Sequence, residues 1–313
     1  MSKTLRGIIT FISIIFVFFL VMMHKDEFGS LFQNTKPIPM LTLILLQIPL
    51  IALRGYPFKV LVSSLGYEIR IRDWAGLSFI ANFLNLVLPY RPGMVFRYWY
   101  LKKHYRLPLS HFTRVSLFYF ALLIACSGLM VVFPLFWIPI PEVFLAPFYL
   151  FLEWLGLGVL LTGFTLIGLG FLLKRLQVKA KSKELLKSFA PFIKHPHHLL
   201  KTLTGFIILQ GLTGLSFYVT FIGLNAPLSF IHCIFIVGFS TLFMIVPLTP
   251  GNFGLLETAL GGLTQALFGN FSLGFSAILL FRIAQLLIST LLGSGFCLLL
   301  LGHFFPSKIR STL

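Results

Sequence analysis

The chain of 313 residues is 58% hydrophobic and only 11% charged, and its mean hydropathy is +0.96. One soluble core cannot bury so much apolar surface, so these values exclude an ordinary soluble protein and predict that lipid surrounds much of the chain. The formal net charge of +17 is confined to a few loops between apolar segments, which favours contact with anionic headgroups and excludes nucleic acid as an expected partner.

Successive apolar segments are long enough for membrane helices, and the period-2 alternation of a membrane barrel is absent. We therefore predict an all-α, polytopic membrane protein with a single membrane domain over residues 1–313. The first segment follows Lys3 and Arg6 like a secretory signal, but no small-residue cleavage site follows it, so we expect a retained span. The segments are residues 7–23, 38–53, 74–90, 112–139, 146–173, 203–224, 228–248, 252–268 and 274–302.

The distribution of Lys and Arg predicts the side of the membrane that each loop occupies, because cytoplasmic loops accumulate these residues. If residues 74–90 crossed the bilayer, the basic stretches on either side of them would lie on opposite faces. If residues 74–110 form a re-entrant hairpin instead, every Lys and Arg except Lys25, Lys36 and Arg282 lies inside or at the inner edge. We therefore predict a multi-pass protein of the cell membrane whose N- and C-termini are both cytoplasmic.

The other segments complete this topology. Residues 174–201 are predicted to be a basic cytoplasmic connector that rests on anionic headgroups. Residues 228–268 contain no Lys or Arg, so charge leaves open whether they form a second hairpin or two full spans. With the hairpin, the chain has about six full spans, predicted at residues 7–23, 38–53, 112–139, 146–173, 203–224 and 274–302.

Two of the apolar regions are interrupted by the same pattern, P-x-x-P-G. The first copy begins at Pro89 and the second at Pro247, about half the chain later. Each half then contains two spans, a broken hairpin and a third span, which predicts an inverted-topology repeat of residues 1–139 and 146–305. The predicted hairpin tips contain Pro89, Pro92, Gly93, Pro247, Pro250, Gly251, Asn252 and Gly254.

These interruptions matter because hydrocarbon cannot satisfy exposed backbone groups. Proline removes an amide donor and glycine frees the backbone, so each tip needs protein or water beside it. Two tips that enter from opposite faces would meet near the bilayer centre, where transporters of this construction bind their substrates. A pair of kinked helices that serve only packing is the alternative.

Ionisable residues near the tips are candidates for substrate binding, because a charge inside the membrane is costly and normally faces a cavity, a partner or a substrate. Arg97 follows the first tip, Glu257 follows the second, and Arg282 lies in an apolar run. The guanidinium of Arg282 suits a phosphate or the carboxylate of Glu257, so a buried pair with no ligand role is the alternative. Arg91, Arg97 and Arg114 would line the cytoplasmic mouth and bind a lipid phosphate, unless they are ordinary positive-inside charge.

No metal, cofactor or covalent chemistry is expected. The run His195-Pro196-His197-His198 has no Cys or acidic residue nearby and its proline interrupts helical spacing, which favours a solvated loop over a metal site. Glu257 is the one carboxylate deep in the membrane, and no paired carboxylates or nucleophile set are visible. We therefore expect that the protein is not an enzyme.

Two motif regions carry a resemblance to a known family. The first contains Asn82, Asn85, Leu88-Pro89, Gly93 and Arg97, and the second reads P-G-x-x-G-x-x-E from Pro250 to Glu257, followed later by Phe281-Arg282. Together they resemble the lysylphosphatidylglycerol synthase transmembrane-region family of flippase-like integral membrane proteins. Met94 and Thr113 depart from that pattern, because acidic residues are usual at both places in the family.

The resemblance implies translocation of an anionic lipid, which would be a phospholipid, an aminoacylated phospholipid or a polyprenyl-linked glycolipid. The membrane region uses the 313 residues, so we expect no aminoacyl transferase domain in them, and a separate lipid-synthesising enzyme is the protein partner that the resemblance implies. Our leading hypothesis is a flippase-like transporter whose arginines neutralise a lipid phosphate. The alternatives are a small-solute secondary transporter and a membrane-embedded enzyme that modifies lipids.

Overall fold

The computed structural model describes residues 35–88, 92–138, 196–245 and 250–301, together with Met22, Gly29 and Gln33. Helices make up all the regular structure of these residues, and no strand occurs among them, which confirms the all-α prediction. The predicted spans at 7–23 and 146–173 and most of the connector lie outside the described residues.

The described helices fall into two series along the chain. The first series is α3 (Pro37–Leu53), α4 (Tyr56–Ser63), α5 (Ile71–Val87), α6 (Pro92–Tyr105) and α7 (Leu109–Leu135). The second series is α10 (Pro196–Gly223), α11 (Phe230–Ile245), the short 3₁₀ turn η1 (Pro250–Asn252), α12 (Leu255–Phe268) and α13 (Phe271–Leu301).

Four helical stretches are long and apolar enough to cross a membrane. They have 27 to 30 residues and mean hydropathies of 1.6 to 2.4, and they are Pro37–Ser63, Leu109–Leu135, Pro196–Gly223 and Phe271–Leu300. The first corrects the sequence-based boundary, because α4 continues the apolar stretch beyond residue 53 after a break at Arg54 and Gly55. Together with the all-helical composition, these stretches establish a polytopic membrane protein.

The helices between these stretches are shorter. α5, α6, α11 and α12 have 17, 14, 16 and 14 residues, which at 1.5 Å per residue is about 21–26 Å and less than the ~30 Å hydrocarbon core. They pair as two helical hairpins, α5 with α6 and α11 with α12. Whether residues 228–268 enter and leave the membrane on one face stays a prediction.

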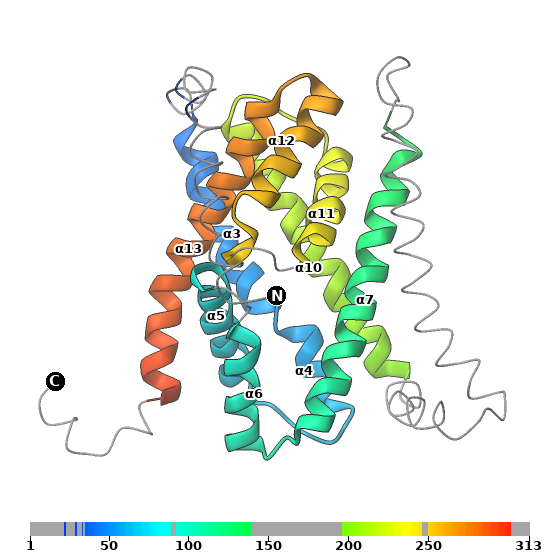
Figure 1. Ribbon diagram of the computed structural model, residues 1–313, viewed down its shortest axis with the longest axis vertical. Coiled ribbons are helices and arrows are strands. Elements are labelled where there is room, and N and C mark those ends of the chain that lie inside the picture. Colours follow the sequence, from blue (N-terminus) through cyan, green and yellow to red (C-terminus); the bar gives the residue numbers. More distant parts are fainter. Residues whose placement is uncertain are drawn as a thin grey trace, which may run out of the picture.

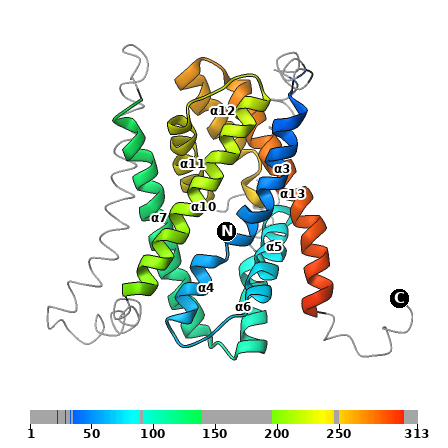
Figure 2. The same cartoon turned by 180° about the vertical axis from the view of Figure 1, so that it is seen from behind.

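The two hairpins occupy opposite halves of the molecule and point their tips toward each other (Figure 1). Gly251 in η1 lies against the end of α5, since a Cβ atom on Gly251 would lie 3.1 Å from the carbonyl oxygen of Leu86. α3 and α10 pack together along one side of this pair, as the reverse view also shows (Figure 2). The tip of the second hairpin therefore lies against the end of α5.

Each hairpin packs against a long helix of the other series. The first arm of the first hairpin, α5, packs against α13, and the first arm of the second hairpin, α11, packs against α7. An inverted repeat would produce this arrangement. The repeat itself stays a prediction.

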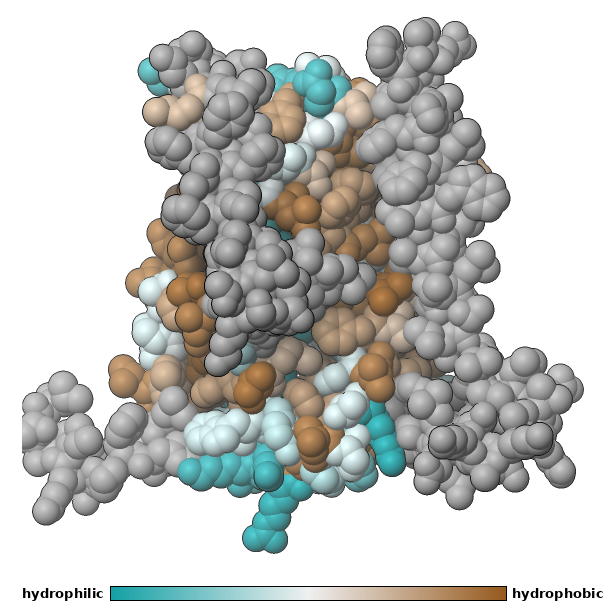
Figure 3. All heavy atoms as spheres, viewed as in Figure 1, coloured by the Kyte–Doolittle hydropathy of each residue, from teal (hydrophilic) through white to brown (hydrophobic). Residues whose placement is uncertain are grey.

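Apolar side chains face both the interior and the surroundings. The interior contains stacked rings such as Phe217 with Phe281, whose centroids lie 4.9 Å apart. Large side chains on the long helices, including Leu129 and Leu298, are exposed. Figure 3 shows such hydrophobic residues over the middle of the visible face and hydrophilic residues at the end where α6 stops, which is the pattern expected of a surface that lies in lipid.

We predict that Gly93→Ala destabilises the first hairpin. A Cβ atom at Gly93 would lie 2.3 Å from the carbonyl oxygen of Ala81, so α6 must move away from α5. We expect a loss of about 1–3 kcal/mol, measured as a lower unfolding temperature of the detergent-solubilised protein.

The matched control is Gly262→Ala in α12, where nothing lies within 4 Å of the added atom. Alanine favours the helix there by up to about 1 kcal/mol, so stability should stay equal or rise. Equal unfolding temperatures for the two variants would contradict the close approach of α5 and α6.

Candidate functional site

At the tip of the second hairpin the helical backbone is interrupted, and its glycines adopt positive φ angles. Gly251, Asn252 and Gly254 have φ angles of +56°, +56° and +83°, a region that glycine tolerates and that asparagine enters more readily than most residues. The side-chain amide of Asn252 donates to the carbonyl oxygen of Phe243 at 3.0 Å, which ties the tip to the end of α11.

Glu257 caps the helix that follows this tip. Its Oε2 accepts a hydrogen bond of 2.8 Å from the backbone N–H of Gly254, at the start of α12. A carboxylate in the first turn also interacts favourably with the positive end of the helix dipole. The P-G-x-x-G-x-x-E pattern thus has a local explanation: its glycines allow the turn, and its glutamate satisfies the N–H groups that the turn exposes.

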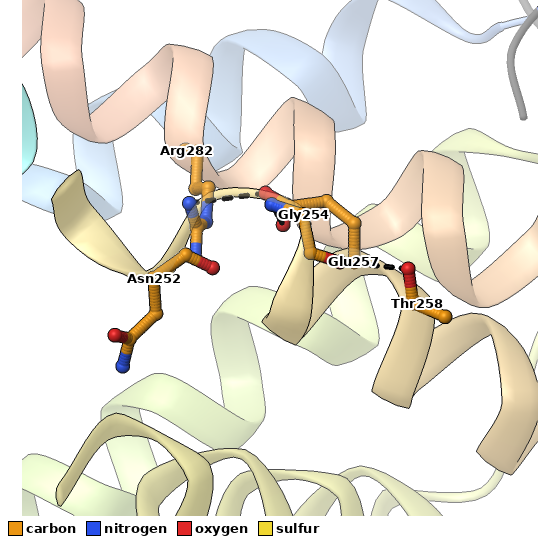
Figure 4. Close-up of polar contacts among 5 residues, drawn as sticks. All are labelled: Asn252, Gly254, Glu257, Thr258 and Arg282. Atoms are coloured by element: carbon orange, nitrogen blue, oxygen red, sulfur yellow. Dashed lines mark hydrogen bonds and ion pairs between the residues drawn. The ribbon is translucent and has the colours of Figure 1, made fainter. Parts of the chain in front are cut away.

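Arg282 on α13 completes this arrangement. Its Nη1 lies 3.0 Å from Oε1 of Glu257, and its Nη2 donates to the carbonyl oxygen of Asn252 at 3.2 Å. The guanidinium also lies over the ring of Phe253, 4.8 Å from its centroid. Figure 4 shows Arg282 and Glu257 directed at each other across the tip. Their side chains are 4% and 0% exposed, so the pair that sequence analysis gave as the alternative to a ligand role forms and is buried.

The first hairpin is closed in a different way. Gly93, at the start of α6, donates its backbone N–H to Oδ1 of Asn85 on α5 at 2.9 Å. This bond and the close contact with Ala81 hold α6 against α5 just after the turn. Pro89 and Arg91 lie outside the described residues.

A chain of hydrogen bonds connects the first hairpin with two long helices. Arg54, in the break between α3 and α4, donates from Nη1 to Oδ1 of Asn82 on α5. The amide nitrogen of Asn82 donates in turn to Oγ of Ser289 on α13 at 2.7 Å. Ser289 shares one face of α13 with Arg282 and Gln285, because these residues are spaced three and four positions apart. One polar face of α13 therefore serves both hairpins.

A cavity of two adjoining chambers lies between the hairpins and the long helices. The first chamber, of about 190 Å³, lies beside the two hairpin tips, and the second, of about 180 Å³, lies against α10, α11 and α13. The two chambers share Arg54 and Tyr119 among their lining residues. The polar residues that line only the first are Ser78, Asn82, Asn85, Arg97 and Asn252, and those that line only the second are Gln210, Thr213, Ser240, Thr241, Arg282 and Gln285.

The lining of the cavity is cationic. It contains Arg54, Arg97 and Arg282, and none of the described residues that line it is Asp or Glu. Glu257 is 0% exposed and pairs with Arg282 behind the surface. The amide nitrogen of Gln285, which is 1% exposed, has no hydrogen-bond partner within the described part of the chain. Charge and donors of this kind favour an anion in the cavity.

Some of the predicted site residues line the cavity, and others do not. Arg97 lines the first chamber, with its guanidinium 5.1 Å from the centroid of the Phe58 ring. Arg114 is half-buried on α7 and is not among the residues that line either chamber. The described tip residues Pro92 and Gly93 begin α6, and Pro250, Gly251, Asn252 and Gly254 lie in the turn before α12, whereas Pro247, like Pro89 and Arg91, lies outside the described residues. Whether these residues bind a substrate stays a prediction.

Arg54 is the residue that sequence reasoning missed. The prediction counted it as a charge in a cytoplasmic loop, but it lines both chambers. A usable signal was present, because residues 57–63 resume the apolar character of the preceding helix. An arginine followed by such a run lies within a membrane stretch.

Four long apolar stretches, two short helical hairpins and a cationic cavity define the class of this protein, an all-α polytopic membrane protein with a cavity among its helices. The chain belongs to the lysylphosphatidylglycerol synthase TM region family, which residues 7–293 match. This match confirms the resemblance that the two motif regions carry, and it makes the chain a membrane protein of a lipid-related family. No curated protein and no solved structure matches the chain.

We predict that removing one partner of the Arg282–Glu257 pair costs more stability than replacing both. Arg282→Met leaves the carboxylate buried without its counter-charge, which typically costs about 3–5 kcal/mol. Adding Glu257→Gln removes the charge and keeps an oxygen for the Gly254 N–H, so much of the loss should be regained. Unfolding temperatures of both variants in detergent test this.

A double variant as unstable as Arg282→Met alone would contradict the prediction. It would mean that the pair contributes through its hydrogen bonds to the tip and that charge compensation adds little.

Proposed function

We propose that this protein is a flippase-like transporter that moves an anionic lipid between the two leaflets of the cell membrane. The headgroup would pass through the cavity between the hairpins while the tail stays in the bilayer. The observation that carries the proposal is the cationic cavity, where three arginines face a space without a carboxylate among its described lining residues. An enzyme that makes the transported lipid would be its partner, and the protein itself would catalyse no covalent change.

In this proposal the two hairpins are re-entrant and enter from opposite faces, with both chain termini in the cytoplasm. Each arm is shorter than a full span, and the two tips lie against each other at Gly251 and Leu86. Interrupted backbone is tolerated at membrane depth where it is buried in protein or faces a water-filled cavity. The contact between the tips would then be the barrier that a headgroup has to pass.

The arginines supply the chemistry that this transport requires. A phosphate is costly to bring into the membrane interior, and a guanidinium lowers that cost because it presents paired donors to phosphate oxygens. Tyr119 lines both chambers, and amides such as Asn85 and Gln285 line one chamber each. These side chains would donate hydrogen bonds to the headgroup along its path. The tail needs no polar passage, since lipid surrounds the long helices.

We predict that Arg97→Gln reduces lipid flipping to the rate of protein-free vesicles. The substitution removes a cationic group from the first chamber and leaves a polar side chain there. The measurement is the loss of fluorescence of labelled phosphatidylglycerol when a membrane-impermeant quencher is added to reconstituted vesicles. Arg282→Ala and Glu257→Ala should also abolish flipping while the protein still inserts.

The matched control is Lys102→Gln, which removes a charge from the exposed side of the same helix, α6. It should flip lipid at the wild-type rate. Wild-type flipping by the Arg97, Arg282 and Glu257 variants would refute the proposal. A covalent product from labelled lipid would favour a lipid-modifying enzyme instead, and uptake of a water-soluble anion without lipid flipping would favour a small-solute transporter.

A further inference from the structure

The three cavity arginines have different partners. Arg282 has a carboxylate 3.0 Å away and also donates to a backbone carbonyl, so its charge is compensated within the protein. Arg54 donates to an amide oxygen of Asn82, and Arg97 lies over the ring of Phe58. Within the described ranges, no Asp or Glu forms an ion pair with Arg54 or Arg97. Among the described residues, the positive charge without an ion-pair partner is therefore in the first chamber.

The geometry of this chamber brings the two arginines to one space. Arg97 comes from α6 of the first hairpin and Arg54 from the break between α3 and α4, and both line the first chamber together with Tyr119. Asn252 of the second hairpin tip also lines this chamber. Half-buried guanidinium groups without a counter-charge are unfavourable in a protein interior, so an anion between them would be stabilised.

The hydrogen bonds around Arg54 fix its position without neutralising it. Asn82 accepts from Arg54 and donates to Ser289 on α13, so its amide is held from both sides. An aspartate of nearly the same shape would form an ion pair with Arg54. The chain has asparagine there, which leaves the positive charge available to a ligand.

We propose that the first chamber is a phosphate site, in which Arg54 and Arg97 together bind the phosphate of a lipid headgroup, and that Arg282 is a positioning residue which holds the second hairpin tip. This inference rests on the proposed function and names its substrate class. Phosphatidic acid and phosphatidylglycerol are lipids that present such a phosphate.

The deciding variant is Asn82→Asp. It keeps the shape of the side chain but gives Arg54 an internal carboxylate, so the chamber loses its net attraction for phosphate. We expect the affinity of the purified full-length protein for dihexanoyl phosphatidic acid to fall at least tenfold, measured by titration calorimetry in detergent. Arg54→Gln and Arg97→Gln should weaken binding to a similar degree.

Ser289→Ala is the matched control, because it removes the other hydrogen bond of Asn82 without adding a charge. It should change the affinity less than threefold. Unfolding temperatures show whether each variant is folded. The three chamber variants, Asn82→Asp, Arg54→Gln and Arg97→Gln, test the site independently, so the other two still test it if one does not fold. Unchanged binding in the folded chamber variants would overturn the proposal.

Two further ligands identify the source of the phosphate. Dihexanoyl phosphatidylcholine, whose headgroup also carries a positive charge, should bind more weakly than phosphatidic acid, and inorganic phosphate should bind more weakly than either lipid. Equal affinity for inorganic phosphate and phosphatidic acid would assign the site to the free ion and overturn the headgroup assignment.

Failure of this inference and failure of the proposed function give different results. Normal flipping by Asn82→Asp with unchanged binding would remove the phosphate site but keep the flippase. Binding that depends on Arg54 in a protein that does not flip lipid would keep the site and remove the flippase.

Discussion

The buried contact of Arg282 with Glu257 and the second hairpin tip is the interaction on which the centre of this protein depends. An interrupted helix exposes backbone donors and acceptors that hydrocarbon cannot satisfy. Glu257 accepts from the N–H of Gly254, and Arg282 donates to the carbonyl of Asn252, so the two side chains satisfy one group of each kind. Because they also compensate each other's charge, the tip can remain inside the protein without a ligand.

The rest of the cavity follows from the position of that tip. Gly251 packs against the end of α5, so the second hairpin sets where the first hairpin can end. On the opposite side, α13 holds the first hairpin through Ser289 and the second through Arg282. One helix face thus contacts both hairpins.

The sequence predicted the helical fold and the two interruptions, because hydropathy, proline and glycine each have local physical consequences. It offered the pairing of Glu257 with Arg282 as one alternative, because a buried charge needs a partner. It did not predict Arg54. The positive-inside rule counts charges in loops, and it placed Arg54 in one, although the apolar sequence resumes after the break. The bond of Asn82 to Ser289 joins residues 207 positions apart, and no local pattern contains such a contact.

The same reasoning separates two kinds of buried arginine. An arginine whose counter-charge belongs to the protein, such as Arg282, contributes to the fold, and a second anion gains little by approaching it. An arginine held by an amide, such as Arg54, is also fixed in position, but the amide does not compensate its charge. The difference between the two is a single side-chain group, carboxylate or carboxamide. In a cavity where water is limited, that group decides which arginine supports the structure and which can meet an anionic headgroup.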